Sequence, residues 1–202
     1  MNILLLGLPG AGKGTHGEIL RKKYNIYHLS SGKAIRNVAK QNTSLGTVVK
    51  RYIDRGKLVP DEIMIKLMRK NIIKLKGKDK LLDGFPRNMK QVQFLDDVFS
   101  DINEELNVCI LLQVSRKELI TRLKGRRVCK HDGTIYHVEF DPPKKEGICD
   151  KCGGSLFQRK DDKKEIIKKK IKKTREKIDK IKKYYKKKGI LEIVNGSNKS
   201  QE

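Results

Sequence analysis

Aromatic side chains are scarce in this chain, which has no tryptophan, six tyrosines and five phenylalanines. Only the pair Tyr184-Tyr185 interleaves with the most basic segment, so a row of rings for stacking nucleic-acid bases is not evident. No apolar run approaches the roughly eighteen residues of a membrane-spanning helix, and the apolar N-terminal run is too short for a signal peptide. We therefore expect a cytoplasmic protein.

Acidic residues are also few, because 24 Asp and Glu stand against 48 Lys and Arg and leave a formal charge of +24. Such an excess favours anionic partners such as nucleic acid, an anionic membrane or highly charged small substrates. Much of it lies in residues 160–188, where lysines separate apolar residues at helical spacing. The apolar series is Ile167, Ile171, Ile178, Ile181 and Tyr185. We expect one or two amphipathic helices with a solvated cationic face; the alternative is a dedicated RNA or membrane patch.

Cysteine is limited to positions 109, 129, 149 and 152 of the 202 residues. In a reducing compartment the last three are more consistent with metal ligands or free thiols than with disulfides. Cys109 lies in an apolar run and is interpreted as a small buried residue. The chain length suits one domain, or one core with small inserts, and allows a substantial apolar interior.

The clearest motif is the sequence Gly-Leu-Pro-Gly-Ala-Gly-Lys-Gly-Thr at residues 7–15. It follows the apolar run 3–6 and leads into Ile19-Leu20, which is the strand, turn and helix context of a phosphate-binding loop. Its glycines let backbone N–H groups close around a polyphosphate, Lys13 adds a positive charge, and the Thr15 hydroxyl is placed to ligate Mg²⁺. The loop predicts binding of a nucleoside triphosphate, and the alternative is a glycine-rich turn that matches by chance.

Apolar strands alternate with helical segments along the chain, which is typical of βα units and a parallel sheet. Strands are expected at residues 3–6, 27–29, 80–82, 108–113 and 191–194. Helices are expected at residues 34–40, 45–55, 61–75, 89–99 and 116–124. Between 128 and 158 the helical periodicity gives way to Gly, Pro, Cys, Asp and aromatic residues, which indicates a small inserted module rather than core.

A second chemical signature is Leu81-Leu82-Asp83-Gly84-Phe85-Pro86-Arg87, a strand that ends in a carboxylate before a turn with an arginine. At the carboxyl edge of a parallel strand, Asp83 can hold Mg²⁺ through water and Arg87 can form a two-pronged contact with a phosphate. Asp-Gly also makes ordinary turns. Because the chain also contains the phosphate-binding loop, we favour the interpretation in which Asp83 and Arg87 bind magnesium and phosphate.

These motifs and several others, in this order, resemble the adenylate kinase family in its long form with a large lid insert, over residues 1 to about 199. The remaining motifs are Ser30-Ser31-Gly32 with Arg36, Gly56-Lys57-Leu58-Val59, Gln91, Gly125-Arg126-Arg127, Tyr136-His137, Asp141-Pro142-Pro143 and Arg159-Lys160-Asp161-Asp162. The resemblance implies a P-loop nucleotide kinase fold with a central parallel sheet flanked by helices. It further implies a core of residues 1–29, 60–121 and 160–202, a helical monophosphate-binding insert at 30–59 and a small β-rich lid at 122–159.

The resemblance also assigns roles to individual residues. For ATP it implies Gly10, Ala11, Gly12, Lys13, Gly14, Thr15, Arg126, Tyr136, His137 and Lys199. For AMP it implies Ser31, Gly32, Arg36, Lys57, Leu58, Val59, Gly84, Arg87, Gln91, Arg159 and Lys170, with the Gln91 amide reading the adenine edge. The implied catalytic charges are Lys13, Arg87, Arg122, Arg126, Arg159 and Lys170, and Thr15 and Asp83 would hold magnesium. Phosphoryl transfer between two polyanions needs this placement of charge more than covalent chemistry.

The lid insert carries Cys129-x2-Asp132 and, after sixteen residues, Cys149-x2-Cys152. This spacing resembles a four-ligand zinc ribbon in which Asp replaces one cysteine, so a structural Zn²⁺ is expected. His131 is a competing fourth ligand that the spacing favours less. The alternative is a lid without metal, held by a polar hydrogen-bonded network as in other members of the family.

Three features depart from the family pattern. Lys33 stands where an Asp is usual after the Ser-Gly of the monophosphate insert. Lys170 replaces a phosphate-gripping arginine, which keeps the charge but loses the planar two-pronged contact. The chain ends soon after Asn195-Gly196-Ser197, where relatives continue into a last helix, so we expect either a naturally short protein or a shortened one.

The sequence thus predicts a monomeric enzyme that transfers phosphate reversibly from MgATP to AMP, giving two ADP, without an obligatory nucleic-acid or membrane partner. A kinase for UMP or CMP is the nearest competing hypothesis, although Gln91 and the long lid favour AMP. A nucleic-acid-binding module is a further hypothesis, suggested by the lysine excess. So is a nucleotide binder whose catalysis is weakened by Lys170 and the short C-terminus.

Overall fold

The computed structural model describes residues 1–55, 57–159, 162 and 164–197. Its centre is a five-stranded parallel sheet in the order β2-β3-β1-β4-β8. The strands are β1 (Asn2–Gly7), β2 (Tyr27–Ser30), β3 (Lys80–Asp83), β4 (Val108–Gln113) and β8 (Leu191–Asn195). All five expected strands are present, which confirms the α/β architecture with a central parallel sheet.

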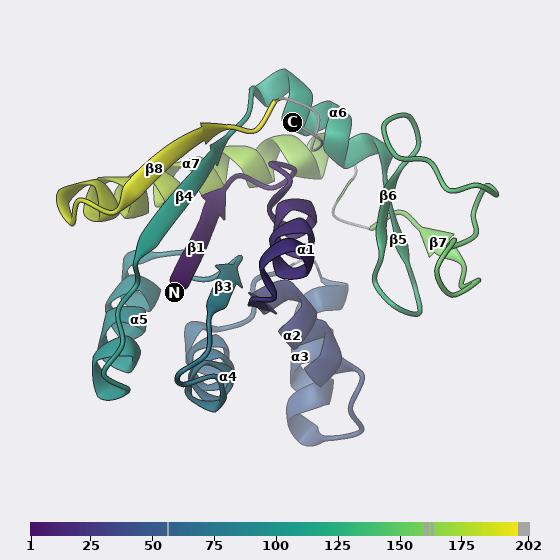
Figure 1. Ribbon diagram of the computed structural model, residues 1–202. Helices are drawn as coiled ribbons and strands as arrows, with labels where there is room; N and C mark the ends of the chain where they lie inside the picture. Colours follow the sequence, from purple (N-terminus) through teal and green to yellow (C-terminus); the bar gives the residue numbers. More distant parts are fainter. Residues whose placement is uncertain (56, 160–161, 163, 198–202) are drawn as a thin grey trace.

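Helices cover both faces of this sheet (Figure 1). They are α1 (Lys13–Tyr24), α2 (Ser31–Ala39), α3 (Ser44–Asp54), α4 (Asp61–Lys74), α5 (Met89–Asp101), α6 (Arg116–Gly125) and α7 (Lys164–Lys187). α2 begins at Ser31, three residues before the expected start at residue 34, because the extended Ser30 directly precedes the first helical turn. The basic segment forms one long helix, α7, rather than two.

The core divides according to the face of the sheet. On one face, β1 and β4 pack against α4, α5 and α7 through residues such as Leu4, Met68, Leu95 and Ile181. On the other face, Ile3, Leu5 and Leu81 pack with Leu20 of α1. β1 is buried along all six residues, as expected for a central strand with both faces covered.

The lid insert is built differently, as a three-stranded antiparallel sheet in the order β6-β5-β7. Its strands are β5 (Arg126–Cys129), β6 (Ile135–His137) and β7 (Leu156–Phe157). Figure 1 shows this small sheet beside the main sheet, beyond the end of α6. The inserted module predicted for residues 128–158 is therefore confirmed as a structural unit, and its first strand begins at Arg126.

No helix among the described residues is long and apolar enough to cross a membrane.

Candidate functional site

The phosphate-binding loop joins the carboxyl end of β1 to the first turn of α1. Gly10 and Gly12 adopt left-handed φ values of 87° and 91°, which a residue with a Cβ rarely adopts. A Cβ on Gly10 would lie 2.9 Å from the Leu123 side chain and 3.1 Å from the Leu119 carbonyl oxygen. Gly12 is the N-cap of α1, so the free N–H groups of the first helical turn face the loop. This arrangement suits an anion, because the N-terminus of a helix carries partial positive charge.

Lys13 lies at the centre of a group of charges from distant segments. Its Nζ donates to the carbonyl oxygens of Gly7 at 2.8 Å and Leu8 at 3.1 Å. Burial lowers the pKa of Lys13 to about 8; the carboxylate of Asp83 opposes this shift, whereas Arg87, Arg126 and Lys170 reinforce it. One carboxylate and three cations are therefore near enough to the Lys13 ammonium group to shift its pKa.

Asp83 ends β3 next to the loop, in register with Leu5 of β1. Its Oδ2 would lie 3.9 Å from a Cβ built on Gly14. Burial raises the pKa of Asp83, but the neighbouring charges of His28 and Lys13 outweigh this effect and hold the pKa below its ordinary value. An ionised carboxylate beside a phosphate-binding loop is a suitable magnesium ligand.

His28 is a residue at this site that the sequence did not single out. Its Nε2 lies 3.6 Å from Asp83 Oδ2, and its Nδ1 lies 3.2 Å from Glu18 Oε1. A Cβ on Gly17 would approach the imidazole to 2.5 Å, so only glycine on this face of α1 leaves room for the ring. In the sequence, the glycine at position 17 within a predicted helix indicates that another group packs closely there, but it does not identify that group as His28.

The Gly84 turn is connected to the first turn of α2. Ser31 Oγ donates to the Gly84 carbonyl oxygen at 2.7 Å, and Arg87 Nε donates to the same oxygen at 2.6 Å. The Arg87 Nη2 lies 3.5 Å from Ser31 Oγ. Ser31, Gly84 and Arg87, which the sequence assigned to one ligand, are thus in direct contact.

Gln91 is buried and both ends of its amide are engaged. Its Oε1 accepts from the Arg87 backbone N–H at 2.7 Å, and its Nε2 donates to Asp61 Oδ1 at 2.6 Å. Asn88 also donates to Asp61. An amide has two donor hydrogens and two acceptor lone pairs, so one of each remains for a ligand. Asp61, in the first turn of α4, thus fixes the orientation of the Gln91 amide on α5, a contact that the sequence motifs do not predict.

Two arginines at the base of the lid insert are anchored to the core. Arg126 forms two hydrogen bonds with the buried Asp162, from Nε at 2.8 Å and from Nη2 at 2.6 Å. Arg122 pairs with Glu118 at 2.6 Å and donates to the Gly196 carbonyl oxygen at 2.8 Å. The second contact attaches α6 to the end of β8.

The tip of the lid insert lies over the phosphate-binding loop, because Ile135 Cδ1 would be 3.7 Å from a Cβ on Gly14. The side chain of Tyr136 is buried among Cys129, Cys149 and Leu156, and its hydroxyl accepts from the Asp150 backbone N–H at 2.8 Å. This burial turns the ring into the small core of the lid. His137 stacks on Phe140 with ring centroids 4.2 Å apart.

The four residues expected to hold metal lie together. Ligand atoms of Cys129, Asp132, Cys149 and Cys152 all lie within 4.8 Å of one another. The Cys129 and Cys152 sulfurs are 3.4 Å apart, and Cys149 Sγ lies 3.7 Å from Asp132 Oδ2. Within the described residues, His131 is not a member of this group, and its backbone N–H instead donates to Cys129 Sγ.

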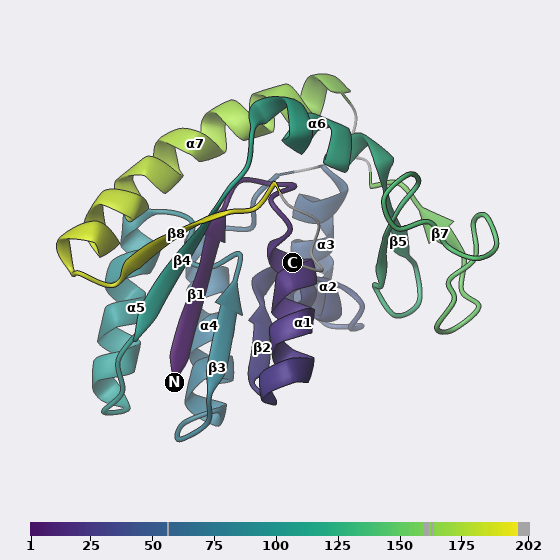
Figure 2. The same cartoon turned by 45° about the horizontal axis from the view of Figure 1, so that its top comes forward.

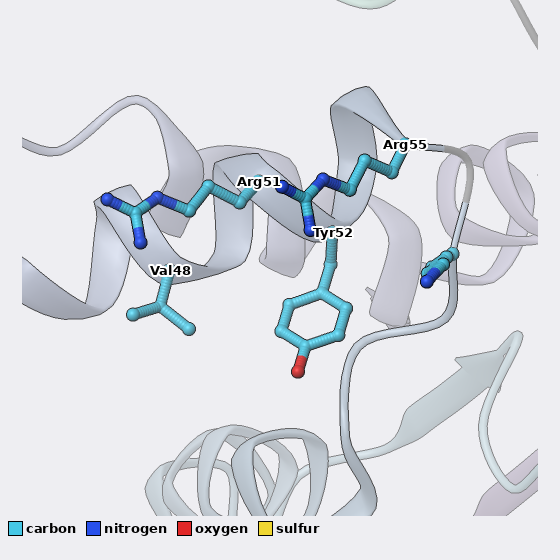
Figure 3. Close-up of a pocket in the computed structure, with 5 residues that line it drawn as sticks. Val48, Arg51, Tyr52 and Arg55 are labelled. Carbon is cyan, nitrogen blue, oxygen red and sulfur yellow. The ribbon is translucent and has the colours of Figure 1, made fainter.

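The remaining predicted residues lie on α2, in the segment before α4 and at α7. Arg36 lies against Gly32, whose Cβ would be 3.1 Å from Arg36 Nη1. Val59 is buried, whereas Lys57 and Leu58 are exposed. A cavity of about 310 Å³ lies beside α3 and is lined by Val48, Arg51, Tyr52, Arg55 and Lys57 (Figure 3). Arg159 precedes the start of α7, half-buried Lys170 lies on α7, and Lys199 lies outside the described residues.

Comparison with known proteins agrees with this geometry. Residues 5–190 match the family model described as "Adenylate kinase". An adenylate kinase of Geobacillus sp. (strain WCH70) is 43% identical over 197 residues, which cover 97% of this chain and 91% of the relative. Similar proteins from Caldicellulosiruptor bescii and Staphylococcus epidermidis are 42% and 43% identical, over 97% and 98% of this chain and 92% of each relative. The chain therefore belongs to the adenylate kinase family.

Proposed function

We propose that this protein is an adenylate kinase, which transfers the terminal phosphate of MgATP to AMP reversibly and forms two ADP. The observation that carries the proposal is the convergence on Lys13 of Asp83, Arg87, Arg126 and Lys170. These residues come from the loop, the β3 edge, the lid insert and α7. A site that joins two polyphosphates end to end needs positive charge from several directions around the migrating group.

The ATP phosphates would bind to the loop residues Gly10, Ala11, Gly12, Lys13, Gly14 and Thr15, with Arg122 and Arg126 on the lid side. The residues present fit magnesium, because Asp83 is ionised near Gly14 and the exposed Thr15 hydroxyl lies on the next helical position. When bound, Mg²⁺ neutralises charge on the phosphate oxygens. Lys13 contributes a positive charge that is positioned by the loop carbonyls of Gly7 and Leu8.

AMP would bind between α2 and the Gly84 turn. Ser31, Gly84 and Arg87 already form one connected group there, and Arg36 lies beside Gly32 on the same helix. The spare donor and acceptor of Gln91 would read the adenine edge, while Asp61 and the Arg87 backbone hold the amide in place. Lys57, Leu58 and Val59 would border the base, and Arg159 and Lys170 would contact phosphate from the α7 side.

The three functional parts would be the core at 1–29, 60–121 and 160–202, the monophosphate insert at 30–59 and the lid at 122–159. The contact of Ile135 with the loop supports a lid that excludes water from the transferring phosphate. Exclusion of water would suppress hydrolysis of ATP during transfer. His137 would lie on the ATP side of the lid, whereas the buried side chain of Tyr136 would support the lid from within.

The lid would hold a structural Zn²⁺ through Cys129, Asp132, Cys149 and Cys152. Two thiolates about 2.3 Å from one ion in a tetrahedron lie about 3.8 Å apart. The Cys129 and Cys152 sulfurs, 3.4 Å apart, are near that value. A thiolate and a carboxylate oxygen on one such ion lie about 3.6 Å apart, and Cys149 Sγ is 3.7 Å from Asp132 Oδ2. Four protein ligands leave no open position for a substrate, so the metal would stabilise the lid without taking part in transfer.

The proposed function is tested by measuring ADP formation from ATP with AMP, CMP, UMP or GMP as acceptor, with Mg²⁺ present and then chelated. Magnesium-dependent turnover with AMP far above the other acceptors is expected. Preferred turnover on a pyrimidine nucleotide would overturn the acceptor assignment, and no turnover with any acceptor would leave a nucleotide binder without kinase activity.

A further inference from the structure

The outward face of α7 carries a row of cations that the kinase chemistry does not use. We name it the lysine ridge, and it consists of Lys169, Lys172, Lys173, Lys180, Lys183 and Lys187, all of them exposed. The residues recur at helical steps on the side opposite Ile171, Ile178 and Ile181, which pack into the core. Figure 2 shows α7 along the outer rim of the molecule.

The part of the chain that the structure describes leaves most of this charge uncompensated, although Glu176 lies on the same face, four residues from Lys172 and from Lys180. Across the described residues, no ridge lysine forms an ion pair; Lys188 pairs with Asp96 just beyond the helix, outside the ridge. Glu176 and Asp179 are the only acidic residues in the sequence between Lys168 and Lys187. Like charges at helical i,i+4 spacing, such as Lys169 with Lys173 and Lys183 with Lys187, destabilise a helix.

The length of the ridge suits several phosphates of a phosphodiester backbone. Eighteen helical steps at about 1.5 Å each place Lys169 and Lys187 about 27 Å apart, a length that spans about eight phosphates of one strand. One strand of a nucleic-acid duplex presents a phosphate about every 3.4 Å along its axis. We propose that the lysine ridge is a docking site for the phosphodiester backbone of double-stranded nucleic acid, independent of base sequence.

The side chains around the ridge favour this partner over an anionic membrane. Helices that bind in a membrane interface insert large apolar side chains from the exposed face. Along the described part of α7, the one exposed large hydrophobic residue is Ile166, at the end of the helix before the ridge begins. The ridge also carries no aromatic ring, which excludes stacking on single-stranded bases and leaves contacts with phosphates.

The test is binding of a fluorescently labelled duplex of about 20 base pairs, once as DNA and once as RNA, to the full chain at several salt concentrations. Counterion release makes log K fall with log salt with a slope of about −0.9 for each phosphate that is neutralised. We expect the fourfold variant Lys173→Gln, Lys180→Gln, Lys183→Gln and Lys187→Gln to bind at least tenfold more weakly at about 0.1 M salt. Its slope should become shallower by about 3.6 if each of the four lysines neutralises one phosphate.

A matched control removes the same charge from another helical surface. The fourfold variant Lys66→Gln, Lys70→Gln, Lys74→Gln and Lys76→Gln alters exposed lysines on and just after α4. It should retain duplex binding and the salt slope, and both variants should keep ADP-forming activity, because neither alters a site residue. If the parent chain formed no ADP, only the proposed kinase function would be contradicted. The ridge proposal would stand, since duplex binding is measured without nucleotide.

Three results would overturn the proposal. Equal loss in both variants would show that only the net charge matters, and absence of duplex binding at about 0.1 M salt would show that the ridge has no nucleic-acid partner. Equal or tighter binding to vesicles of phosphatidylcholine and phosphatidylserine would assign the ridge to a membrane. Comparison of the DNA and RNA arms identifies which nucleic acid supplies the backbone.

Discussion

The parallel core and the lid insert are stabilised by different means. In the core, apolar side chains such as Leu4, Ile72, Leu82 and Ile181 are fully buried on strands and helices that support one another. The lid has only Cys129, Tyr136 and Cys149 as its buried cluster among the described residues, with Leu156 packed against it. A core so small offsets little of the entropy of ordering its loops, so the proposed zinc ligands Cys129, Asp132, Cys149 and Cys152 would supply much of the stability of the lid.

The comparison also separates two uses of charge. In the core, the charges of the site are held against one another near Lys13, where burial shifts the pKa. The lid supplies arginines that are aimed by contacts with the core, as Asp162 aims Arg126. The charges of the core are therefore fixed by their own burial. The position of Arg126 in the lid depends on its hydrogen bonds with Asp162, a contact that we call the joint.

The largest effect is expected from Lys13→Ala, which removes the central charge of the core while leaving the apolar packing intact. Turnover should fall at least about 10³-fold, equivalent to about 4 kcal/mol of transition-state stabilisation. The matched control is Lys22→Ala, which removes an exposed lysine from the same helix. A near-normal rate for Lys13→Ala in a coupled assay would remove Lys13 from the mechanism.

Packing of the core is tested by Ile181→Ala on α7. This side chain is fully buried, so truncation should lower the free energy of unfolding by about 2–5 kcal/mol. Ile166→Ala on the same helix is the control, because Ile166 is 43% exposed and its truncation should cost far less. Urea unfolding of both variants measures the difference, and similar values would contradict the proposed division between the two faces of α7.

The lid is tested by Cys149→Ser, which alters one metal ligand. Zinc content should fall from about one per chain to near zero, and the lid should become more sensitive to protease, with a smaller loss of transfer rate. Cys109→Ala is the control, since Cys109 is buried in β4 and lies outside the metal-binding group. Full zinc content in Cys149→Ser, measured by elemental analysis, would refute the ligand set.

The joint between the two regions is tested by Asp162→Asn. An amide cannot accept both hydrogen bonds of the Arg126 guanidinium with the strength of a carboxylate, so the lid arginine should be aimed less well. We expect KM for ATP to rise by about tenfold with a small change in the melting temperature. Asp96→Asn removes a carboxylate that pairs with Lys188 and is the control. An unchanged KM in Asp162→Asn would show that Arg126 does not depend on this joint.

The smallest effect concerns pH. Because burial lowers the pKa of Lys13 to about 8, the free enzyme should lose this charge as the pH rises through that value. The charged form binds phosphate, so kcat/KM for ATP should be constant below about pH 7.5 and fall above about pH 8. In Lys13→Arg the guanidinium stays charged, so this alkaline decline should disappear even if the rate is lower. A decline that persists in the arginine variant would assign it to another group.

Stability should respond to the same group in the opposite sense. Between about pH 8 and pH 10.5 the unfolded chain holds the Lys13 proton while the folded protein has released it, so this group makes the free energy of unfolding rise with pH in that window. Below about pH 8 both states are protonated and the full cost of the buried charge remains. Loss of kcat/KM above pH 8 together with retained folding would therefore separate titration at the site from unfolding.

Much of the architecture could be read from local sequence. The apolar runs on β1, β3 and β4 predicted strands of a parallel sheet, because such strands are covered on both faces and need apolar residues throughout. The loop sequence predicted the turn into α1, because only glycine readily adopts the left-handed conformations of Gly10 and Gly12. The spacing of cysteines predicted a compact module, and the four side chains do lie together.

The sequence alone determined the element types, the phosphate-binding loop and the likeness to a kinase family, since these depend on periodicity and on motifs of adjacent residues. Only the tertiary structure decided the strand order, the placement of His28 between Glu18 and Asp83, and the engagement of Gln91 by Asp61. It also placed Tyr136 inside the lid and Asp162 against Arg126. These contacts join residues far apart in the chain, and they form only when crossover connections and burial bring separate segments to the same edge of the sheet.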